Sequence, residues 1–341
     1  MSDSADNWEV QSIIEDRRAV VNAAFPEELP VVDPERLWSA SRYLIDAGGK
    51  RLRPTVLLLT AEALADVVPG SISYRAFPDL DGQSLDILSA ALSVEIIQTF
   101  TLIHDDIMDD DRYRRGVETV HEAYDLETAI LAGDTLYAKS FEIMLNTDTE
   151  MDRVLRSVRL LAETCTAICE GQARDVGFEG RSDVTMSEYA HMIEEKTAVL
   201  YATSAALPGI LLGSPDETVD ALYEFGMEFG RAFQIKDDVL DLTTDTSTLG
   251  KDQASDLLEG KRTAVTIHAQ EAGIDVDNLL EEAGSVEAAV AKLDEVGSIR
   301  HAESLAQQYI DDANERLEVL PDNQATSLLV DLSQFIIDRD Y

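Results

Sequence analysis

The sequence contains a run of aspartates, residues 105–111, that could bind a metal ion. Asp105 and Asp109 are four residues apart, as are Asp106 and Asp110. Side chains four apart share one face of an α-helix, so these carboxylates would project into one space. Oxygen ligands without a His or Cys cluster favour a hard ion such as Mg²⁺, which usually completes its shell with water and substrate phosphates.

A second acidic run repeats this spacing. Asp237 and Asp241 are one helical turn apart, and Asp238 lies beside them. In so acidic a chain, either run alone could be a solvated helix face. Each run, however, directly follows an apolar stretch, residues 93–103 and 225–233, that we expect to be buried. Two acidic pairs on two such helices favour facing walls that bind a polyanion through bridging metal ions.

Residues 48–54 combine two glycines, three cations and Pro54, which suits the first turn of a helix. Guanidinium and ammonium groups beside a helix N-terminus suit phosphate. The chain has only seven lysines, and five of them fall within or beside the candidate motifs: Lys50, Lys196, Lys236, Lys251 and Lys261. Two acidic runs and a separate basic patch indicate two phosphorylated substrates, one bound through Mg²⁺ and the other by ion pairs.

The charge of the chain limits its partners. Its 341 residues include 67 acidic and 27 basic ones, giving a net charge of −40. A field of that sign repels phosphate backbones and anionic lipid, so no nucleic-acid partner is expected. Self-repulsion on this scale calls for screening, which predicts a protein adapted to a saline cytoplasm.

No targeting or membrane segment is expected. The acidic N-terminus lacks the basic and apolar regions of a signal peptide. The longest charge-free window, residues 197–215, contains several polar and helix-breaking residues, so we interpret it as a buried helix broken near Pro208 rather than an integral membrane segment. These features predict a cytoplasmic protein.

The elements that must position these residues are helices. Apolar residues recur at spacings of three and four, and strand patterns are scarce. Helices are expected over residues 56–60, 88–103, 128–146, 151–172, 187–207, 219–242 and 304–317. Residues 66–86 are expected to form a long surface connection. With no linker or repeat, the sequence predicts one all-α domain over residues 1–341, whose C-terminal helices, residues 263–341, carry no chemistry that we can identify.

The motifs together resemble those of the trans-isoprenyl diphosphate synthases. They span about residues 45–262 in order: GGKRLRP at 48–54, DDIMDD with RRG at 105–116, GQ at 171–172, KT at 196–197, and FQIKDDVLD at 233–241 with GK at 250–251. That family is all-α, a helical bundle around a deep central cavity, usually as a homodimer. The resemblance implies a prenyltransferase that condenses isopentenyl diphosphate head-to-tail with allylic diphosphates.

The resemblance also implies where the allylic diphosphate binds. Three Mg²⁺ ions would hold it through Asp105, Asp106, Asp109, Asp237, Asp238 and Asp241. Asp110 and Asp111 exceed the family's motif, so the direct ligands in the first run stay open. The same diphosphate would be contacted by Arg114, Lys196, Lys251 and Lys261. Thr197 and Gln234 would place oxygen dipoles near the reacting carbon, and with Lys196 they are the expected catalytic residues.

Isopentenyl diphosphate would bind without metal to Lys50, Arg53 and Arg115, with Gln98 at a position that is often His in relatives. Mg²⁺ and the cationic side chains would stabilise charge on the departing diphosphate, so that an allylic carbocation can form in a pocket poor in water. The double bond of isopentenyl diphosphate would attack that cation, and the released diphosphate would take the final proton. The chemistry therefore needs no side-chain nucleophile.

Phe100 is a candidate for the floor of the cavity. It lies five residues before Asp105, about 7.5 Å along a helix. A bulky ring there could limit the growing chain, although an ordinary core aromatic fits equally well. In archaeal-type relatives an aromatic at this position beside a small residue goes with a twenty-carbon product. The resemblance therefore implies a geranylgeranyl diphosphate synthase.

Four alternatives remain open at this point. A longer-chain polyprenyl diphosphate synthase of the same family would differ only in its product. A terpene cyclase is disfavoured because its second metal motif mixes Asn, Ser and Glu, whereas residues 237–241 keep three aspartates. A non-catalytic partner subunit of a heteromeric synthase would have lost motif aspartates that are intact here. A salt-adapted helical protein that merely holds hydrated cations would show no turnover.

Overall fold

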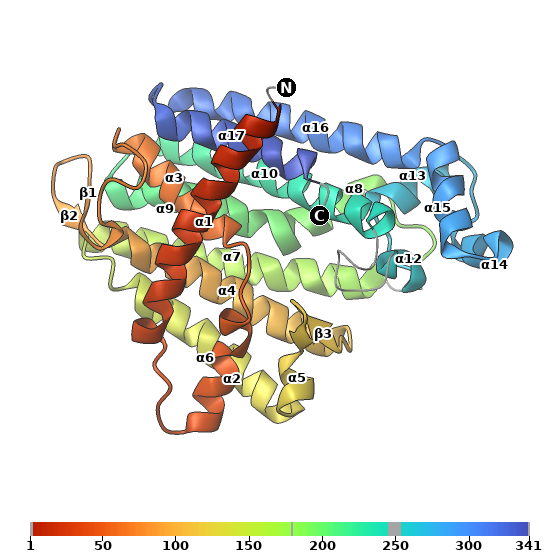
Figure 1. The fold of residues 1–341 in the computed structure, drawn as a ribbon, viewed down its shortest axis with the longest axis horizontal. Coiled ribbons are helices and arrows are strands. Elements are labelled where there is room, and N and C mark those ends of the chain that lie inside the picture. Colours follow the sequence, from red (N-terminus) through yellow and green to blue (C-terminus); the bar gives the residue numbers. More distant parts are fainter. Residues whose placement is uncertain (1–2, 179, 245–253, 340–341) are drawn as a thin grey trace. The chain divides into compact units, whose positions relative to one another are not determined.

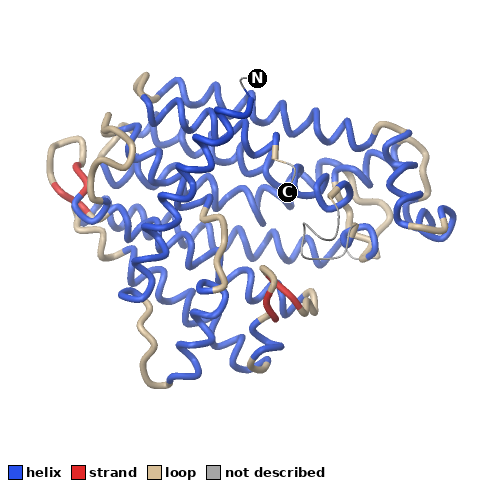
Figure 2. Tube along the Cα trace, in the orientation of Figure 1, coloured by secondary structure: helices blue, strands red, loops and turns tan. Residues whose placement is uncertain are grey.

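The computed structural model describes residues 3–178, 180–244 and 254–339, with side chains from residue 10 onward. These residues form helices joined by loops, with two small antiparallel β-ribbons (Figures 1 and 2). The all-α prediction is confirmed.

The helices of the first half are α1 (Asp3–Glu28), α2 (Glu35–Asp46), α3 (Leu52–Leu64), α4 (Ile87–Met108), α5 (Val120–Ala123), α6 (Leu126–Met144) and α7 (Met151–Phe178). Those of the second half are α8 (Met186–Ile193), α9 (Val199–Leu212), α10 (Asp216–Thr243), α12 (Ser255–Leu258), α13 (Ala264–Glu271), α14 (Leu279–Ala283), α15 (Val286–Glu295), α16 (Ser298–Arg316) and α17 (Gln324–Asp338).

The shorter elements are 3₁₀ turns, a π-helical turn and four strands. The 3₁₀ turns are η1 (Tyr74–Ala76), η3 (Val276–Asn278) and η4 (Leu317–Val319), and the π-helical turn is η2 (Glu194–Ala198). Strands β1 (Phe77–Pro78) and β2 (Ser84–Leu85) pair within the connection between α3 and α4. Strands β3 (Tyr113–Arg114) and β4 (Val117–Glu118) pair directly after α4.

The chain forms two compact units. The first comprises Met1–Glu163, Thr203–Tyr223 and Glu318–Asp331, and the second comprises Thr164–Ala202, Glu224–Leu317 and Leu332–Tyr341. The boundaries between them fall inside α7, α9, α10, η4 and α17 rather than in linkers. The expectation of one domain over residues 1–341 stays a prediction.

Helix α4 is the centre of the first unit. It begins where the Asp86 carboxylate accepts a hydrogen bond from the Ser89 N–H at 3.1 Å, which satisfies a backbone donor that the helix itself leaves unpaired. It packs against α3 and α6. At one contact with α6 a β-carbon on Gly133 would overlap the His104 ring, so glycine permits the close approach of the two helices.

Helix α4 is also the one helix among the described residues that is long and apolar enough to cross a membrane by length and composition. Its most apolar window is 72% buried within the protein. That burial is typical of the core helix of a folded domain.

The second unit has its own apolar core. Ile193, Ile235 and Val239 pack with residues of α13, α15 and α16 in one buried cluster. Helix α8 begins with a capping box, in which the Thr185 hydroxyl and the Glu188 carboxylate satisfy each other's backbone N–H groups. This cap fixes the start of the helical segment that leads into η2.

Two expectations about connections can be compared with the structure. Residues 66–86 do form a long connection, which carries η1 and the first β-ribbon. The break expected near Pro208 was wrong, because α9 continues through Pro208 to Leu212. Its neighbours Leu207 and Leu211 are fully buried, and such packing outweighs the loss of one backbone hydrogen bond.

Candidate functional site

The first aspartate run lies at the C-terminal end of α4. Asp105 and Asp106 occupy its last turn, and the Asp109 N–H still bonds the Asp105 carbonyl at 2.8 Å. Asp110 then adopts a left-handed conformation, φ 56°, and the Asp111 N–H returns to the Asp106 carbonyl at 3.0 Å. This is a helix-terminating motif usually built on glycine. Asp110 therefore leaves the helix, and its expected pairing with Asp106 on one helix face was wrong.

Asp106 is buried and paired with Arg114. The Arg114 Nε–H and Nη2–H groups both approach Asp106 Oδ1, at 2.7 and 2.6 Å, and Nη2 also contacts Asp111 at 2.8 Å. Burial raises the pKa of Asp106, and Arg114 opposes this shift. Asp106 Oδ2 is buried without a hydrogen-bond partner among the described residues. Arg114 thus joins both ends of the acidic run, and one carboxylate oxygen remains for another ligand.

The ribbon of β3 and β4 presents Arg114 and Arg115. Its two turn residues, Arg115 and Gly116, both have positive φ, as a tight hairpin turn requires. Arg115 Nη1 donates to the Leu44 carbonyl at 3.0 Å and to the Gly48 carbonyl. A β-carbon on Gly49 would lie 2.8 Å from the Arg115 guanidinium carbon. The GG and RRG motifs, far apart in sequence, therefore meet as one structure.

The three cations of residues 48–54 differ in their surroundings. Arg51 is buried, with hydrogen bonds to Glu95 at 2.5 Å and to the Ile45 carbonyl at 2.7 Å, so it holds the loop in place. Lys50 is exposed and Arg53 is half-buried. Their assignment to isopentenyl diphosphate stays a prediction.

Phe100 is buried on α4 among other aromatic rings. It meets His104 edge-on at a ring-centroid distance of 5.0 Å, and Tyr137 of α6 at 5.3 Å. Its neighbour Gln98 is half-buried, and the Thr101 hydroxyl donates to the Gln98 carbonyl at 2.9 Å. These contacts hold the Phe100 ring firmly, and its role as a cavity floor stays a prediction.

The second aspartate run lies in α10 of the second unit, in the helical form that its spacing predicts. Asp238 is buried, and both of its oxygens accept hydrogen bonds, from the Tyr189 hydroxyl at 2.5 Å and from Gln234 Nε2 at 3.0 Å. Burial raises the pKa of Asp238 to about 7, and the charge of Asp256 adds to the shift. Added positive charge would stabilise this carboxylate.

Asp241 serves the backbone that follows the undescribed residues 245–253. It accepts hydrogen bonds from the Ser255 hydroxyl at 2.7 Å and from the Asp256 N–H at 3.0 Å. In this structure Asp241 therefore positions the start of α12. Lys251, an expected diphosphate contact, lies outside the described residues.

Lys196 and Thr197 lie in the π-helical turn η2. Such turns insert an extra residue into a helix and are frequent at functional sites. A β-carbon on Gly171 of α7 would overlap the Lys196 backbone, which explains the glycine of the GQ motif. Lys196 Nζ pairs with Asp175 of α7 at 2.5 Å. The Thr197 hydroxyl donates to Gln234 Oε1 at 2.8 Å.

Within the second unit, α10 approaches the segment of η2 and α9 very closely. A β-carbon on Gly226 would overlap the backbone of Tyr201 and Ala202, and one on Gly230 would overlap Ala198. These contacts fix α10 relative to η2. The four side chains Thr197, Gln234, Asp238 and Tyr189 consequently form one continuous hydrogen-bonded chain.

A small cavity of about 100 Å³ joins these groups. Its lining includes Lys196, Thr197, Gln234, Asp238 and Lys261, and also Tyr189, Asp175 and Asp256. Lys261 Nζ lies 2.9 Å from Glu259 and 3.7 Å from Asp256. Sequence reasoning missed Tyr189, Asp175 and Asp256. Their only sequence signal is proximity to a motif: Asp175 lies three residues after the GQ motif, Tyr189 seven before Lys196 and Asp256 five after Lys251, which is too weak to select them.

Sequence reasoning also missed Arg339, just after α17. Its guanidinium pairs with Asp237 and lies 4.3 Å from the ring centroid of Phe233, one helical turn before Asp237. The Arg339 side chain is 7% exposed, whereas that of Asp237 is 41% exposed. The C-terminal part of the chain therefore does contribute a charge to the second motif.

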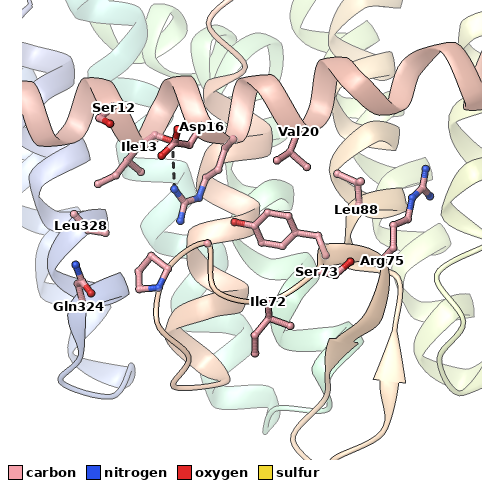
Figure 3. Close-up of a pocket in the computed structure, with 14 residues that line it drawn as sticks. Ser12, Ile13, Asp16, Val20, Ile72, Ser73, Arg75, Leu88, Gln324 and Leu328 are labelled. Carbon is pink, nitrogen blue, oxygen red and sulfur yellow. Dashed lines mark hydrogen bonds between the residues drawn. The ribbon is translucent and has the colours of Figure 1, made fainter.

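A larger cavity of about 900 Å³ in the first unit is separate from the predicted site residues (Figure 3). Asp16, Arg75 and Gln324 are among its polar lining. Arg75 is already paired with Glu28 and Asp86, both at 2.7 Å. The other arginine of this lining, Arg17, is likewise paired with a carboxylate, that of Glu62.

The acidic groups suit a metal ion that is completed by its substrate. Among the described residues no three Asp, Glu, His or Cys side chains gather closely enough to hold an ion by themselves. Two observations nonetheless indicate sites that gain from a cation: a buried Asp106 oxygen has no partner within the described part of the chain, and the pKa of Asp238 is raised. Mg²⁺ is commonly held by one or two carboxylates plus phosphates and water, so the residues present fit it.

The chain has the all-α isoprenoid synthase fold, with one aspartate motif on each of two helices. The Polyprenyl synthetase family matches residues 34–298, and the chain belongs to this family. It is 59% identical to a geranylfarnesyl diphosphate synthase of Natronomonas pharaonis over 99% of both chains.

Solved structures support the same assignment. The geranylgeranyl pyrophosphate synthetase of Geoglobus acetivorans matches with a TM-score of 0.85 at 41% identity, over 97% of this chain and 99% of that one. A polyprenyl synthase of Caulobacter crescentus, in complex with calcium and isoprenyl diphosphate, matches with a TM-score of 0.84 at 28% identity, over 98% of each chain.

Proposed function

We propose that the protein is a trans-isoprenyl diphosphate synthase that condenses isopentenyl diphosphate head-to-tail with dimethylallyl, geranyl and farnesyl diphosphates. The observation that carries the proposal is the hydrogen-bonded chain of Thr197, Gln234 and Asp238 beside Lys196, in a member of the Polyprenyl synthetase family. A synthase needs such fixed dipoles and charges next to a departing diphosphate, because preorganised groups stabilise developing charge without reorganising.

The second unit would bind the allylic diphosphate. When bound, Mg²⁺ would neutralise charge on the leaving group. The proposed ligands are Asp237, Asp238 and Asp241 on this unit, and Asp105, Asp106 and Asp109 on the first unit. Lys196 and Lys261 would donate to the diphosphate oxygens, exchanging their present carboxylate partners for phosphate. The Thr197 and Gln234 oxygens would face the carbon at which positive charge develops.

The first unit would bind isopentenyl diphosphate through Lys50, Arg53 and Arg115, with Gln98 as a further donor. The hydrogen bonds from Arg115 to the Leu44 and Gly48 carbonyls support this assignment, because they fix a guanidinium beside the basic loop. Arg114 would act at the allylic site through Asp106 and Asp111.

Two product lengths have specific support. The buried Phe100 ring, held by His104 and Tyr137, favours geranylgeranyl diphosphate. Similarity to the Natronomonas geranylfarnesyl diphosphate synthase favours a product one isoprene unit longer. We propose geranylgeranyl diphosphate as the main product, with geranylfarnesyl diphosphate as the second candidate.

One assay tests both the prenyltransferase activity and the product length. The purified chain is incubated with isopentenyl diphosphate, each allylic primer and Mg²⁺, and the products are sized by chromatography. Turnover is expected, and it should be lost in Asp105→Ala and Asp237→Ala. If no primer is extended, the proposed activity is refuted and a non-catalytic partner subunit is favoured. Phe100→Ala should shift the product to longer chains, and an unchanged length would remove Phe100 as the floor.

We also propose a homodimer, in the saline cytoplasm of its host. Helix α6 and the residue that follows it carry exposed apolar side chains that a second copy would cover: Leu126, Ile130, Leu131, Tyr137 and Leu145. Light scattering on a sizing column should give twice the chain mass. Ile130→Asp should shift it toward the monomer, while Val68→Asp, at a 65% exposed position outside α6, should not. A monomeric wild-type chain would refute the proposal.

A further inference from the structure

Arg339 contacts a carboxylate that a bound metal ion would need as a ligand. Its guanidinium donates to Asp237 Oδ1, and Asp237 is a predicted metal ligand of the second motif. A carboxylate oxygen that accepts from a guanidinium has less charge to offer an ion, and a cation beside it repels a second cation. The contact therefore has consequences for metal binding.

The Arg339 guanidinium is packed and hydrogen-bonded at its Nη2 group but not at its Nε group, within the described residues. The guanidinium packs on the Phe233 ring at 4.3 Å, and Nη2 lies 3.5 Å from the Phe233 carbonyl. Arg339 Nε, however, is buried without a hydrogen-bond partner among the described residues. An unmet buried donor costs free energy, so this arrangement is less stable than a fully bonded one.

Asp237 lies among other carboxylates that also favour a nearby cation. Asp237, Asp238 and Asp241 lie within five residues of α10, and the Asp256 N–H donates to Asp241 at 3.0 Å, which brings a fourth acidic residue to the same segment. A guanidinium brought in from the end of the chain offsets part of this negative charge. The Arg339 side chain is almost fully buried in this ion pair. Salt therefore screens the pair less than it would screen an exposed one.

We infer that Arg339 is a tethered counter-ion that holds Asp237 in the metal-free protein and gives way when a divalent cation binds. The inference rests on the proposed function, because it takes the second aspartate motif as a metal site. Metal loading would thus be coupled to release of the residue that follows α17. Arg339 is a positioning residue in this scheme, acting on the metal site through Asp237.

Arg339→Met tests the inference, because methionine keeps an apolar stem over Phe233 and removes the charge. Binding of Mn²⁺, with inorganic pyrophosphate present, can be followed by the electron paramagnetic resonance of the free ion. The variant should bind Mn²⁺ roughly tenfold more tightly than the wild type, as expected for removal of a charged competitor. Arg316→Met is the matched control, since Arg316 pairs with Glu224 at 2.9 Å in the same unit with both side chains about half exposed.

The outcomes are distinct. Unchanged or weaker Mn²⁺ binding in Arg339→Met would overturn the inference, as would an equal gain in Arg316→Met. If Arg339→Met does not fold, hydrogen exchange of the wild type decides instead: amides of residues 335–339 should exchange faster with Mn²⁺ and pyrophosphate, and unchanged exchange would overturn it. Asp237→Asn distinguishes failure of the Arg339 inference from failure of the proposed metal site. If this variant binds Mn²⁺ like the wild type, the metal site itself is refuted.

Discussion

Replacing Asp238 by Asn should stabilise the metal-free protein at neutral and alkaline pH. Asp238 is 4% exposed, and burial raises its pKa from an ordinary 3.8 to about 7. A carboxyl whose pKa is higher in the folded state binds its proton more tightly there. The folded state therefore loses stability as the pH rises from about 4 to about 7, and the loss is complete above the folded pKa.

The size of this loss follows from the shift. Each pKa unit corresponds to about 1.4 kcal/mol, so a carboxyl raised from 3.8 to about 7 costs about 4 kcal/mol when it ionises in the folded state. An asparagine stays neutral at every pH and keeps the shape. Its amide can still accept from Tyr189, and the Gln234 amide can turn over to accept from it.

Denaturant unfolding with a metal chelator at about pH 5 and about pH 8 measures the effect. The free energy of unfolding of Asp238→Asn should exceed that of the wild type at the higher pH by up to about 4 kcal/mol, and the gap should shrink at the lower pH. Parallel stability profiles of the two proteins across this range would refute the reasoning, because Asp238 would then ionise as easily folded as unfolded.

Three further outcomes are expected. Tyr189→Phe should destabilise the metal-free protein at about pH 8 by roughly 1.5–3 kcal/mol, because ionised Asp238 loses a hydrogen-bond donor. This effect is opposite in sign to that of Asp238→Asn. An unchanged unfolding midpoint would contradict the prediction. Gly171→Ala should cost roughly 1–3 kcal/mol in thermal unfolding through overlap with Lys196, whereas Gly177→Ala on the same helix, which meets open space, should not; equal effects would refute the contact. Stability and turnover should both rise between about 0.1 M and about 2 M KCl, and full activity in dilute buffer would contradict the salt requirement.

The local form of both aspartate motifs could be predicted from the sequence, because spacing of four residues and an apolar run specify a helix face. The exact end of α4 could not. Asp110 adopts a backbone conformation that usually signals glycine, so nothing in its residue type marks the point where the chain leaves the helix. The same limit applies to Pro208, where buried packing outweighs a local preference.

Contacts between distant segments were also beyond the sequence. The basic loop contains three similar cations, and only the fold shows that Arg51 forms a buried ion pair with Glu95. Arg339 lies 102 residues after Asp237, in a stretch with no recognisable motif, so its place beside the second motif depends entirely on tertiary structure. Tyr189 donates to Asp238 from 49 residues away for the same reason.

The glycine contacts at positions 226 and 230 have a practical consequence for engineering. Backbone meets backbone there, so the spacing between the two helical segments owes nothing to the bulk of side chains at positions 197 and 234. A library that varies both positions would therefore change the hydrogen bonds that reach Asp238 while the two backbones keep their spacing.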